Sequence, residues 1–350
     1  MKHSILRRSV WCALTAALAA GSGHAAQAVA DQGIVTSDGP YKLSTNARVT
    51  YVAVAHVYDP AANRLYSSTR GGVYQYDTLT MKVIGRSADV RGAGSLALDA
   101  ARSELYVLAL HDDTMQVLDV TTKKVVRTFP APAWFNVFYE ENRGELYFLR
   151  GDSKELRVAD RTDGRTLSTI ALGGRPSFVV GDPARQRVLV RLADKPLIQV
   201  IDTKDRSIVA SWPARADGPS AVTISRDGTR VFISAGRDIA MLDGLTGKEI
   251  ARTSVGDPTY SLVFDDATGY VGALSGPGRL NVVKADASSV KLVQSLNTGA
   301  LIHELFLDPK THTILGASRY ADEGLMMDVN APDMAGGDGY GTLVTFTLRK

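Results

Sequence analysis

Seven side chains suited to ligand binding or proton transfer stand in short segments that precede runs of apolar residues. They are Arg91, Trp134, Asn136, Arg175, Tyr260, His303 and Glu304. Together these cations, aromatic rings, amide, imidazole and carboxylate suit an anionic or ring-containing small molecule. His303 next to Glu304 suits proton transfer if a partner lies within hydrogen-bond reach. Because adjacent residues on a strand point to opposite sides, we expect these two not to share one site.

Metal and haem sites find little support in the residue types. Beyond residue 28 the sequence holds four histidines, His56, His111, His303 and His312, and no cysteine. Their spacing matches no metal-ligand motif, and no C-x-x-C-H haem motif occurs. We therefore expect no metal and no cofactor.

An acidic segment, residues 319–341, provides the weak alternative of a calcium site. Its oxygen ligands would be Asp328, Asn330, Asp333 and Asp338, although their spacing is not that of an EF-hand loop. Contact with a partner, or disorder, are the other interpretations of this segment.

Five aspartates recur at a nearly constant spacing, which raises the question of paired catalytic carboxylates. Asp77, Asp119, Asp160, Asp202 and Asp243 lie 42, 41, 42 and 41 residues apart. Each follows an apolar run and opens a tight turn, where an aspartate side chain accepts hydrogen bonds from nearby backbone N–H groups. We expect these carboxylates to cap turns rather than to act in catalysis.

The same period organises the chain into seven units. Each unit holds alternating apolar runs separated by turns rich in Gly, Asp, Asn and Pro, which is typical of antiparallel strands. Four strands about every 42 residues predict an all-β fold, a seven-bladed β-propeller with four-stranded antiparallel blades. A blade buries its faces only between neighbours, so we expect the ring to close.

Closure requires a strand from the other end of the sequence. The last unit has strand patterns at 304–307, 313–317 and 342–348, one short of a complete blade. Tyr41–Ala47 precedes the first unit and has no other partner. We predict that it pairs antiparallel with Leu343–Thr347 as the outer strand of blade seven.

Loops that lead into the innermost strands of a propeller converge at the mouth of the central channel. The seven candidate side chains therefore face one site in this interpretation. In the alternative interpretation, Trp134 and Tyr260 pack between blades and the arginines pair with neighbouring carboxylates.

The repeat resembles the YVTN-type repeat of YncE-like seven-bladed propellers, which are exported bacterial proteins. The stretches "ELYVLALHDDTMQVLDVTTKKVVRTF" and "DGTRVFISAGRDIAMLDGLTGKEIART" carry the resemblance, which covers roughly residues 50–320. Lys284 replaces the third-strand aspartate in unit six, and the acidic segment has no counterpart in the repeat. The resemblance implies architecture and export; propeller families share blades and differ in their loops, so it does not imply a function.

The N-terminus has the layout of a secretory signal peptide. Lys2, Arg7 and Arg8 precede an apolar run, and an A-x-A site ends at Ala28. We expect residues 1–28 to be cleaved, 29–40 to form a flexible leader, and 41–350 to form one domain with an insert at 319–341. A periplasmic or secreted protein without a transmembrane segment follows from this pattern, and the mature chain is expected to be a monomer.

Three functions compete. The leading hypothesis is a non-enzymatic module that binds a small molecule or an envelope protein at the channel mouth. The second is a lactonase-like hydrolase using Glu304, His303 and Arg175, suggested by similar propellers. Nucleic-acid binding is disfavoured, because loss of three of the 40 basic residues with the signal leaves as many basic as the 37 acidic residues.

Overall fold

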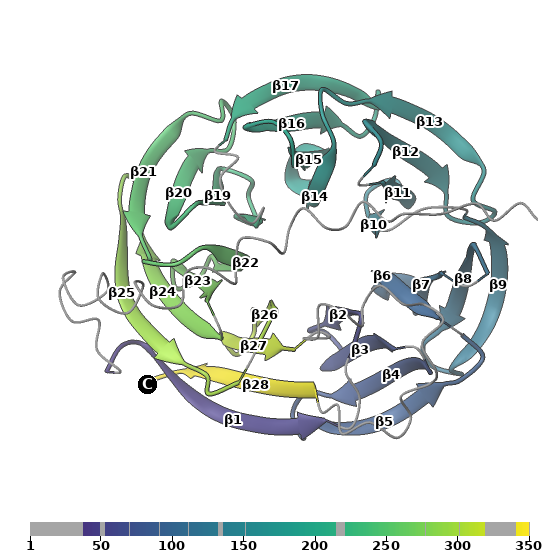
Figure 1. Cartoon of the computed structure of the whole chain (residues 1–350), viewed down its shortest axis with the longest axis horizontal. Coiled ribbons are helices and arrows are strands. Elements are labelled where there is room, and N and C mark those ends of the chain that lie inside the picture. The colour runs from purple at the N-terminus through teal and green to yellow at the C-terminus, as the bar shows by residue number, and fades with distance from the viewer. Residues whose placement is uncertain are drawn as a thin grey trace, which may run out of the picture.

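The computed structural model describes residues 38–49, 53–69, 71–90, 92–110, 112–131, 136–150, 152–214, 221–276, 278–300, 302–318 and 341–349. Within these ranges the chain forms seven four-stranded antiparallel sheets arranged as blades around a central axis (Figure 1). The predicted all-β seven-bladed propeller is confirmed. A helix long and apolar enough to cross a membrane is not found among the described residues.

The blades follow one another along the chain, each from an inner to an outer strand. Blades one to three are β2 (Ala55–Asp59), β3 (Arg64–Thr69), β4 (Gly72–Asp77), β5 (Lys82–Ser87); β6 (Ala93–Asp99), β7 (Glu104–Ala109), β8 (Thr114–Asp119), β9 (Lys124–Pro130); and β10 (Asn136–Glu140), β11 (Glu145–Leu149), β12 (Glu155–Asp160), β13 (Thr166–Ala171). Blades four to six are β14 (Pro176–Asp182), β15 (Arg187–Leu192), β16 (Leu197–Asp202), β17 (Ser207–Pro213); β18 (Val222–Ile224), β19 (Arg230–Ala235), β20 (Asp238–Asp243), β21 (Glu249–Ser254); and β22 (Thr259–Asp265), β23 (Tyr270–Ser275), β24 (Arg279–Ala285), β25 (Val290–Asn297). Blade seven is β26 (Glu304–Asp308), β27 (Thr313–Ala317), β28 (Gly341–Leu348) and β1 (Tyr41–Val49). Two short 3-10 turns, η2 (Ala100–Arg102) and η3 (Pro183–Arg185), follow β6 and β14.

The position of a strand within its blade explains its sequence pattern. The second strands, such as β7, are buried along nearly their whole length, because both of their faces pack against neighbouring blades. The outer strand β9 instead alternates between exposed and less exposed positions, because one of its faces meets solvent. Continuous and alternating apolar runs therefore distinguish the middle of a blade from its rim.

The apolar core is divided among the interfaces between blades. Phe232 of blade five and Phe264 of blade six, for example, lie with ring centroids 4.6 Å apart. One cluster combines Leu65 and Tyr76 of blade one with Leu315 and Leu343 of blade seven. Burial of such surface contributes on the order of 25 cal/mol per Å². The seventh interface therefore adds to the stability of the ring as the other six do.

The chain ends close the ring as predicted. Strand β1 pairs antiparallel with β28, with Tyr41 opposite Leu348 and Ala47 opposite Leu343, and it runs two residues beyond the predicted segment (Figure 1). The side chain of Gln294 on β25 forms hydrogen bonds with the first residue of β1. This amide accepts a hydrogen bond from the Tyr41 backbone N–H at 2.9 Å and donates one to the Tyr41 carbonyl at 2.7 Å.

The recurring aspartates cap turns, as expected. Asp119 Oδ1 accepts hydrogen bonds from the backbone N–H groups of Thr121 and Thr122, at 3.0 and 2.7 Å. These bonds lower the pKa of Asp119, the one from Thr122 most strongly. The same kind of cap is formed by Asp77, Asp160, Asp202 and Asp243.

Candidate functional site at the channel mouth

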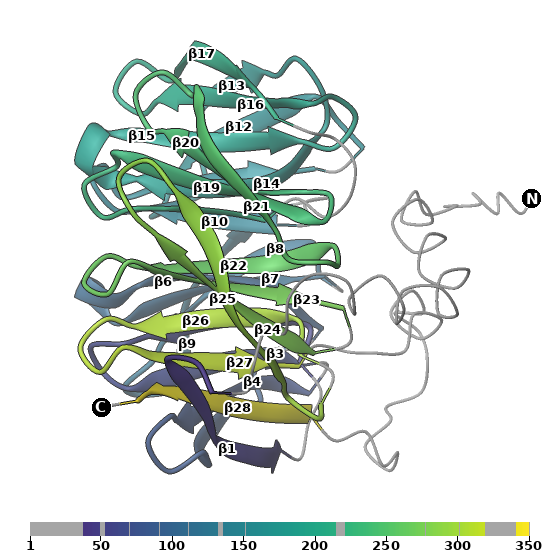
Figure 2. The ribbon, with the colours of Figure 1, turned by 90° about the vertical axis from the view of Figure 1, so that its left-hand side faces the viewer.

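The inner strands lie around the axis and begin at one face of the ring (Figures 1 and 2). Asn136 and Glu304 are the first residues of β10 and β26, and Tyr260 is the second residue of β22. Arg175 directly precedes β14, and His303 directly precedes β26. The structure thus brings five of the seven candidate residues to the face that contains the starts of the inner strands, which we call the channel mouth.

The other candidates lie outside the described residues. These are Arg91 and Trp134 of the mouth, and the calcium candidates Asp328, Asn330, Asp333 and Asp338.

A polar seam joins the starts of neighbouring inner strands. Ser95 Oγ of blade two donates to Asn136 Oδ1 of blade three at 2.6 Å and accepts from the Val137 N–H at 3.2 Å. Ser261 of blade six likewise accepts from the Leu305 N–H of blade seven at 3.0 Å. An unpaired backbone N–H at a sheet edge costs free energy unless a partner is supplied. The seam therefore satisfies inner-strand N–H groups with side chains of the preceding blade.

The seam contains an ionisable pair where blade seven meets blade one. Glu304 Oε2 lies 2.7 Å from His56 Nδ1. The side chain of His56 is 3% exposed and that of Glu304 17%. The imidazole also meets the ring of Phe306 edge-on, with centroids 6.4 Å apart. Packing and the carboxylate together hold this imidazole in a fixed orientation, which is the arrangement of a proton-transfer group or of a rigid hydrogen-bond donor.

Sequence reasoning missed His56 as a member of the site and considered it only as a metal ligand. A signal was present in the repeat. His56 stands three residues before the acidic or turn residue that closes the apolar run of its inner strand, and the same position in the other blades is apolar: Leu96, Val137, Val179, Val222, Leu262 and Leu305. An imidazole at an otherwise apolar position departs from the repeat, and this polar side chain needs a hydrogen-bond partner there.

Arg175 is paired with a carboxylate, as the alternative interpretation expected. Its backbone N–H donates to Asp194 Oδ1 at 2.7 Å, and its Nε lies 3.7 Å from Asp194 Oδ2. The two side chains keep 35% and 26% of their surface exposed. A partly exposed pair of this kind contributes little to stability. The guanidinium can therefore exchange this partner for an anionic ligand at low cost.

Tyr260 packs between blades, which also agrees with the alternative interpretation. Its half-buried ring contacts the cluster that contains Leu280 of blade six and Leu305 of blade seven. Burial, with a smaller contribution from Asp257, raises the pKa of its hydroxyl. His303, also half-buried, donates its backbone N–H to the Ala317 carbonyl at 2.9 Å and so extends the ladder of blade seven. The residue paired with Glu304 across the blade interface is His56.

The described part of the mouth thus offers amide and hydroxyl groups, an exchangeable guanidinium and an oriented imidazole–carboxylate pair. In the described ranges, no three His, Cys, Asp or Glu side chains come together closely enough to hold a metal ion.

Comparisons with known proteins support the fold. No family model matches the sequence, and no curated protein sequence matches it. Among solved structures, hydrazine synthase of Kuenenia stuttgartiensis is similar with a TM-score of 0.65 at 15% identity, over 82% of this chain and 95% of that one. A chain of the mitotic checkpoint complex gives 0.68 at 12%, over 91% and 97%.

A third similar structure is the β-propeller domain of Cps50 (Swd1) from Myceliophteria thermophila. Its TM-score is 0.68 at 14% identity, and the alignment covers 89% of this chain and all of that one. At these identities the likeness concerns the fold alone. A propeller fold is compatible with a ligand-binding or protein-interaction module.

Proposed function

We propose that this chain is a binding module that holds a small anionic ligand at the channel mouth. The observation that carries the proposal is the oriented His56–Glu304 pair at the channel mouth, the face that also carries the Ser95 hydroxyl and the Asn136 amide of other blades. Ligand sites combine a few convergent polar groups with a rigid scaffold, and the inner strands supply that rigidity. Arg175 provides the cation, because its carboxylate partner is exchangeable.

The test is a binding screen on the chain without residues 1–28. Small carboxylates and phosphates are added singly, and binding is followed by thermal shift and then by calorimetry. We expect Arg175→Ala to weaken the best binder about tenfold, since a charge-assisted hydrogen bond is lost. Arg252→Ala is the matched control, because Arg252 pairs with Asp238 and Glu249 and lies on an outer strand. Equal affinity of Arg175→Ala and the unchanged chain places the site elsewhere.

The His56–Glu304 pair also favours a second candidate, a lactonase-like hydrolase. In that role the carboxylate holds the imidazole, and the imidazole accepts a proton from attacking water. His56 then replaces His303 as the candidate base, with Glu304 and Arg175 retained. A lactone panel, assayed with and without divalent metal, checks this candidate. Turnover that is lost in His56→Gln supports it, and no turnover rejects it.

The proposal also includes that the chain is exported and belongs to the YncE-like propellers. The charged start, the apolar run and the A-x-A site within residues 1–28 support export, and the 41- to 42-residue repeat supports the family. Fractionation of expressing cells, with sequencing of the mature N-terminus, tests export. A cytoplasmic protein that keeps Met1 would contradict it.

A further inference from the structure

A cavity lies between blades one and two, among the turns that follow the inner strands. Its volume is ≈ 500 Å³, within the usual range for ligand sites. It is lined by Asp59 at the end of β2, by Ala62 of the turn that follows, by Ala100 and Ser103 of the turn after β6, and by Gln75 of β4. Because inner strands begin at the channel mouth and end at these turns, the cavity belongs to the opposite face.

The turn of blade four can be compared with the turn of blade one that lines this cavity. The turn of blade one reads "DPAANR" (59–64), and that of blade four reads "DPARQR" (182–187). The two differ in charge at one position, where blade one has Ala62 and blade four has Arg185. Blade two also has an arginine at this position, Arg102.

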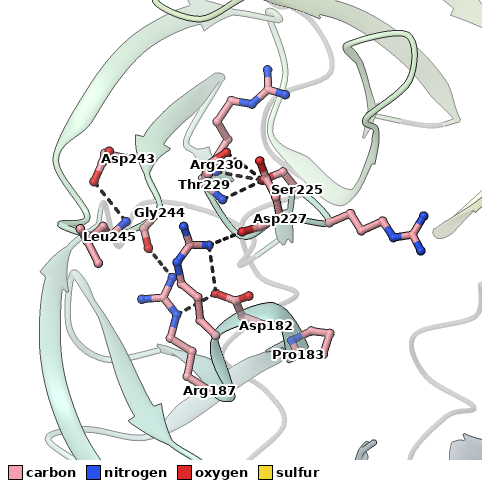
Figure 3. A network of polar contacts seen from close by, with 12 residues as sticks. Asp182, Pro183, Arg187, Ser225, Asp227, Thr229, Arg230, Asp243, Gly244 and Leu245 are labelled. Carbon is pink, nitrogen blue, oxygen red and sulfur yellow. Dashed lines mark hydrogen bonds and ion pairs between the residues drawn. The ribbon is translucent and has the colours of Figure 1, made fainter. Parts of the chain in front are cut away.

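In blade four that arginine reaches across to the next blade. Arg185 Nη1 donates to the Asp227 carbonyl of blade five at 2.5 Å and lies 3.9 Å from Asp182 Oδ2. Figure 3 shows this corner, where Asp182 and Arg187 of blade four meet Asp227 and Gly244 of blade five. In blade one the side chain of Ala62 is too short to reach blade two, and the cavity occupies the corresponding position.

The carboxylate that would receive the missing arginine keeps one oxygen without a hydrogen bond from the described residues. Asp59 Oδ1 caps its own turn by accepting from Ala61 N–H at 2.9 Å and Ala62 N–H at 3.1 Å. Within the described residues, Asp59 Oδ2 has no hydrogen-bond partner. The corresponding oxygen of Asp99 accepts from Arg102 at 3.1 Å and from Tyr139 at 2.6 Å.

The cation already present in the cavity does not prevent entry of a second one. Arg64 Nη1 donates to Asp77 Oδ2 at 2.7 Å, which offsets its charge. Blade four shows that two guanidinium groups fit beside one such carboxylate, since Arg187 Nε lies 2.7 Å from the same Asp182 oxygen that Arg185 faces.

We infer that this cavity is a binding site for a guanidinium group, which takes the position that Arg185 fills in blade four. Planar guanidinium groups bind carboxylate and carbonyl oxygens with directed hydrogen bonds. Leu98, Ala62 and Ala100 supply apolar contact for an aliphatic chain attached to the group. The ligand is therefore a guanidinium compound, either free or as the side chain of an arginine in a peptide.

Calorimetric titration with agmatine tests the site, with N-carbamoylputrescine, the urea analogue of agmatine, as its neutral isostere. We expect agmatine to bind and N-carbamoylputrescine to bind at least tenfold more weakly, because the urea lacks the positive charge that pairs with Asp59. Free L-arginine and the blocked tripeptide acetyl-Gly-Arg-Gly-amide distinguish the two sources, a free compound or a peptide side chain.

Three substitutions locate the binding. Ala62→Arg should abolish agmatine binding by filling the cavity from within. Asp59→Asn keeps the turn cap, since its amide oxygen still accepts, and should weaken binding about tenfold. Arg185→Ala should add a second agmatine site in blade four, seen as a doubled stoichiometry. Equal binding of agmatine and N-carbamoylputrescine, or unchanged agmatine affinity in Asp59→Asn, overturns the inference.

Discussion

At the scale of single residues, the contact with most consequence is the one between His56 and Glu304. The two residues are 248 positions apart, and their contact depends on ring closure. The repeat fixes where inner strands begin, and Glu304 is the first residue of β26. Sequence reasoning could not identify the partner, because the partner lies across the seam between the first and last blades.

A double-mutant cycle measures this contact. With His56→Gln and Glu304→Gln, singly and together, we expect a coupling of about 1–3 kcal/mol in the free energy of unfolding, as for other contacting residues. The control is the exposed pair Arg150 and Asp152, at 2.9 Å, for which coupling should stay below about 1 kcal/mol. A coupling near zero for the first pair shows that the contact is not formed in solution.

The turn carboxylates give a pH-dependent prediction. Hydrogen bonds from the Thr229 N–H, Ser225 and the Thr229 hydroxyl lower the pKa of Asp227 to about 2. Because the folded-state pKa is depressed, this stabilisation is complete above the unfolded-state value and is lost as the pH falls toward 2. Asp227→Ala should cost about 1 kcal/mol at neutral pH. Urea unfolding at pH 7, 4 and 2.5 should show the difference shrinking; a constant difference contradicts the assignment.

At the scale of elements, the period of the sequence was sufficient to predict the blades and the antiparallel pairing of the first strand with the last. Apolar alternation does not, however, define where pairing stops, and β1 continues through Arg48 to Val49 opposite Gly341. The role of Gln294 was also not predictable. Its amide binds the backbone of Tyr41, 253 residues away on β1, and no local sequence pattern in β25 distinguishes this glutamine from other residues.

Removing this amide should loosen the closing strand. In Gln294→Ala the backbone N–H and carbonyl of buried Tyr41 lose their partners, which should lower the free energy of unfolding by about 1–3 kcal/mol. Lys291→Ala, at an exposed position of the same strand, is the control and should change little. Hydrogen exchange should show faster exchange of β1 amides in the Gln294 variant. Equal stability of the two variants contradicts the role of this amide.

At the scale of the whole molecule, the ring presents two faces with different chemistry. Five of the seven residues that sequence reasoning selected lie at the channel mouth, because inner strands begin there. The opposite face holds the capped turns, and its cavity could not be predicted from any local motif. The cavity becomes apparent only when the turns of blades one and four are compared within the fold. The replacement of an arginine by alanine in blade one is informative only because the structure shows what the arginine of blade four contacts.

The central claim is that the two ends of the described chain share one blade, and the placement of His56 beside Glu304 depends on it. Oxidative cross-linking of Lys42→Cys with Thr347→Cys tests it directly, because these residues face each other in the pairing of β1 with β28 and the chain has no cysteine after residue 28. Cross-strand Cα separations of about 4.5–5.5 Å suit a disulfide. We predict rapid, nearly complete disulfide formation in the folded protein and none for Lys42→Cys with Lys124→Cys on the rim of blade two. Failure of the first pair to oxidise while the protein remains folded would contradict the closed ring.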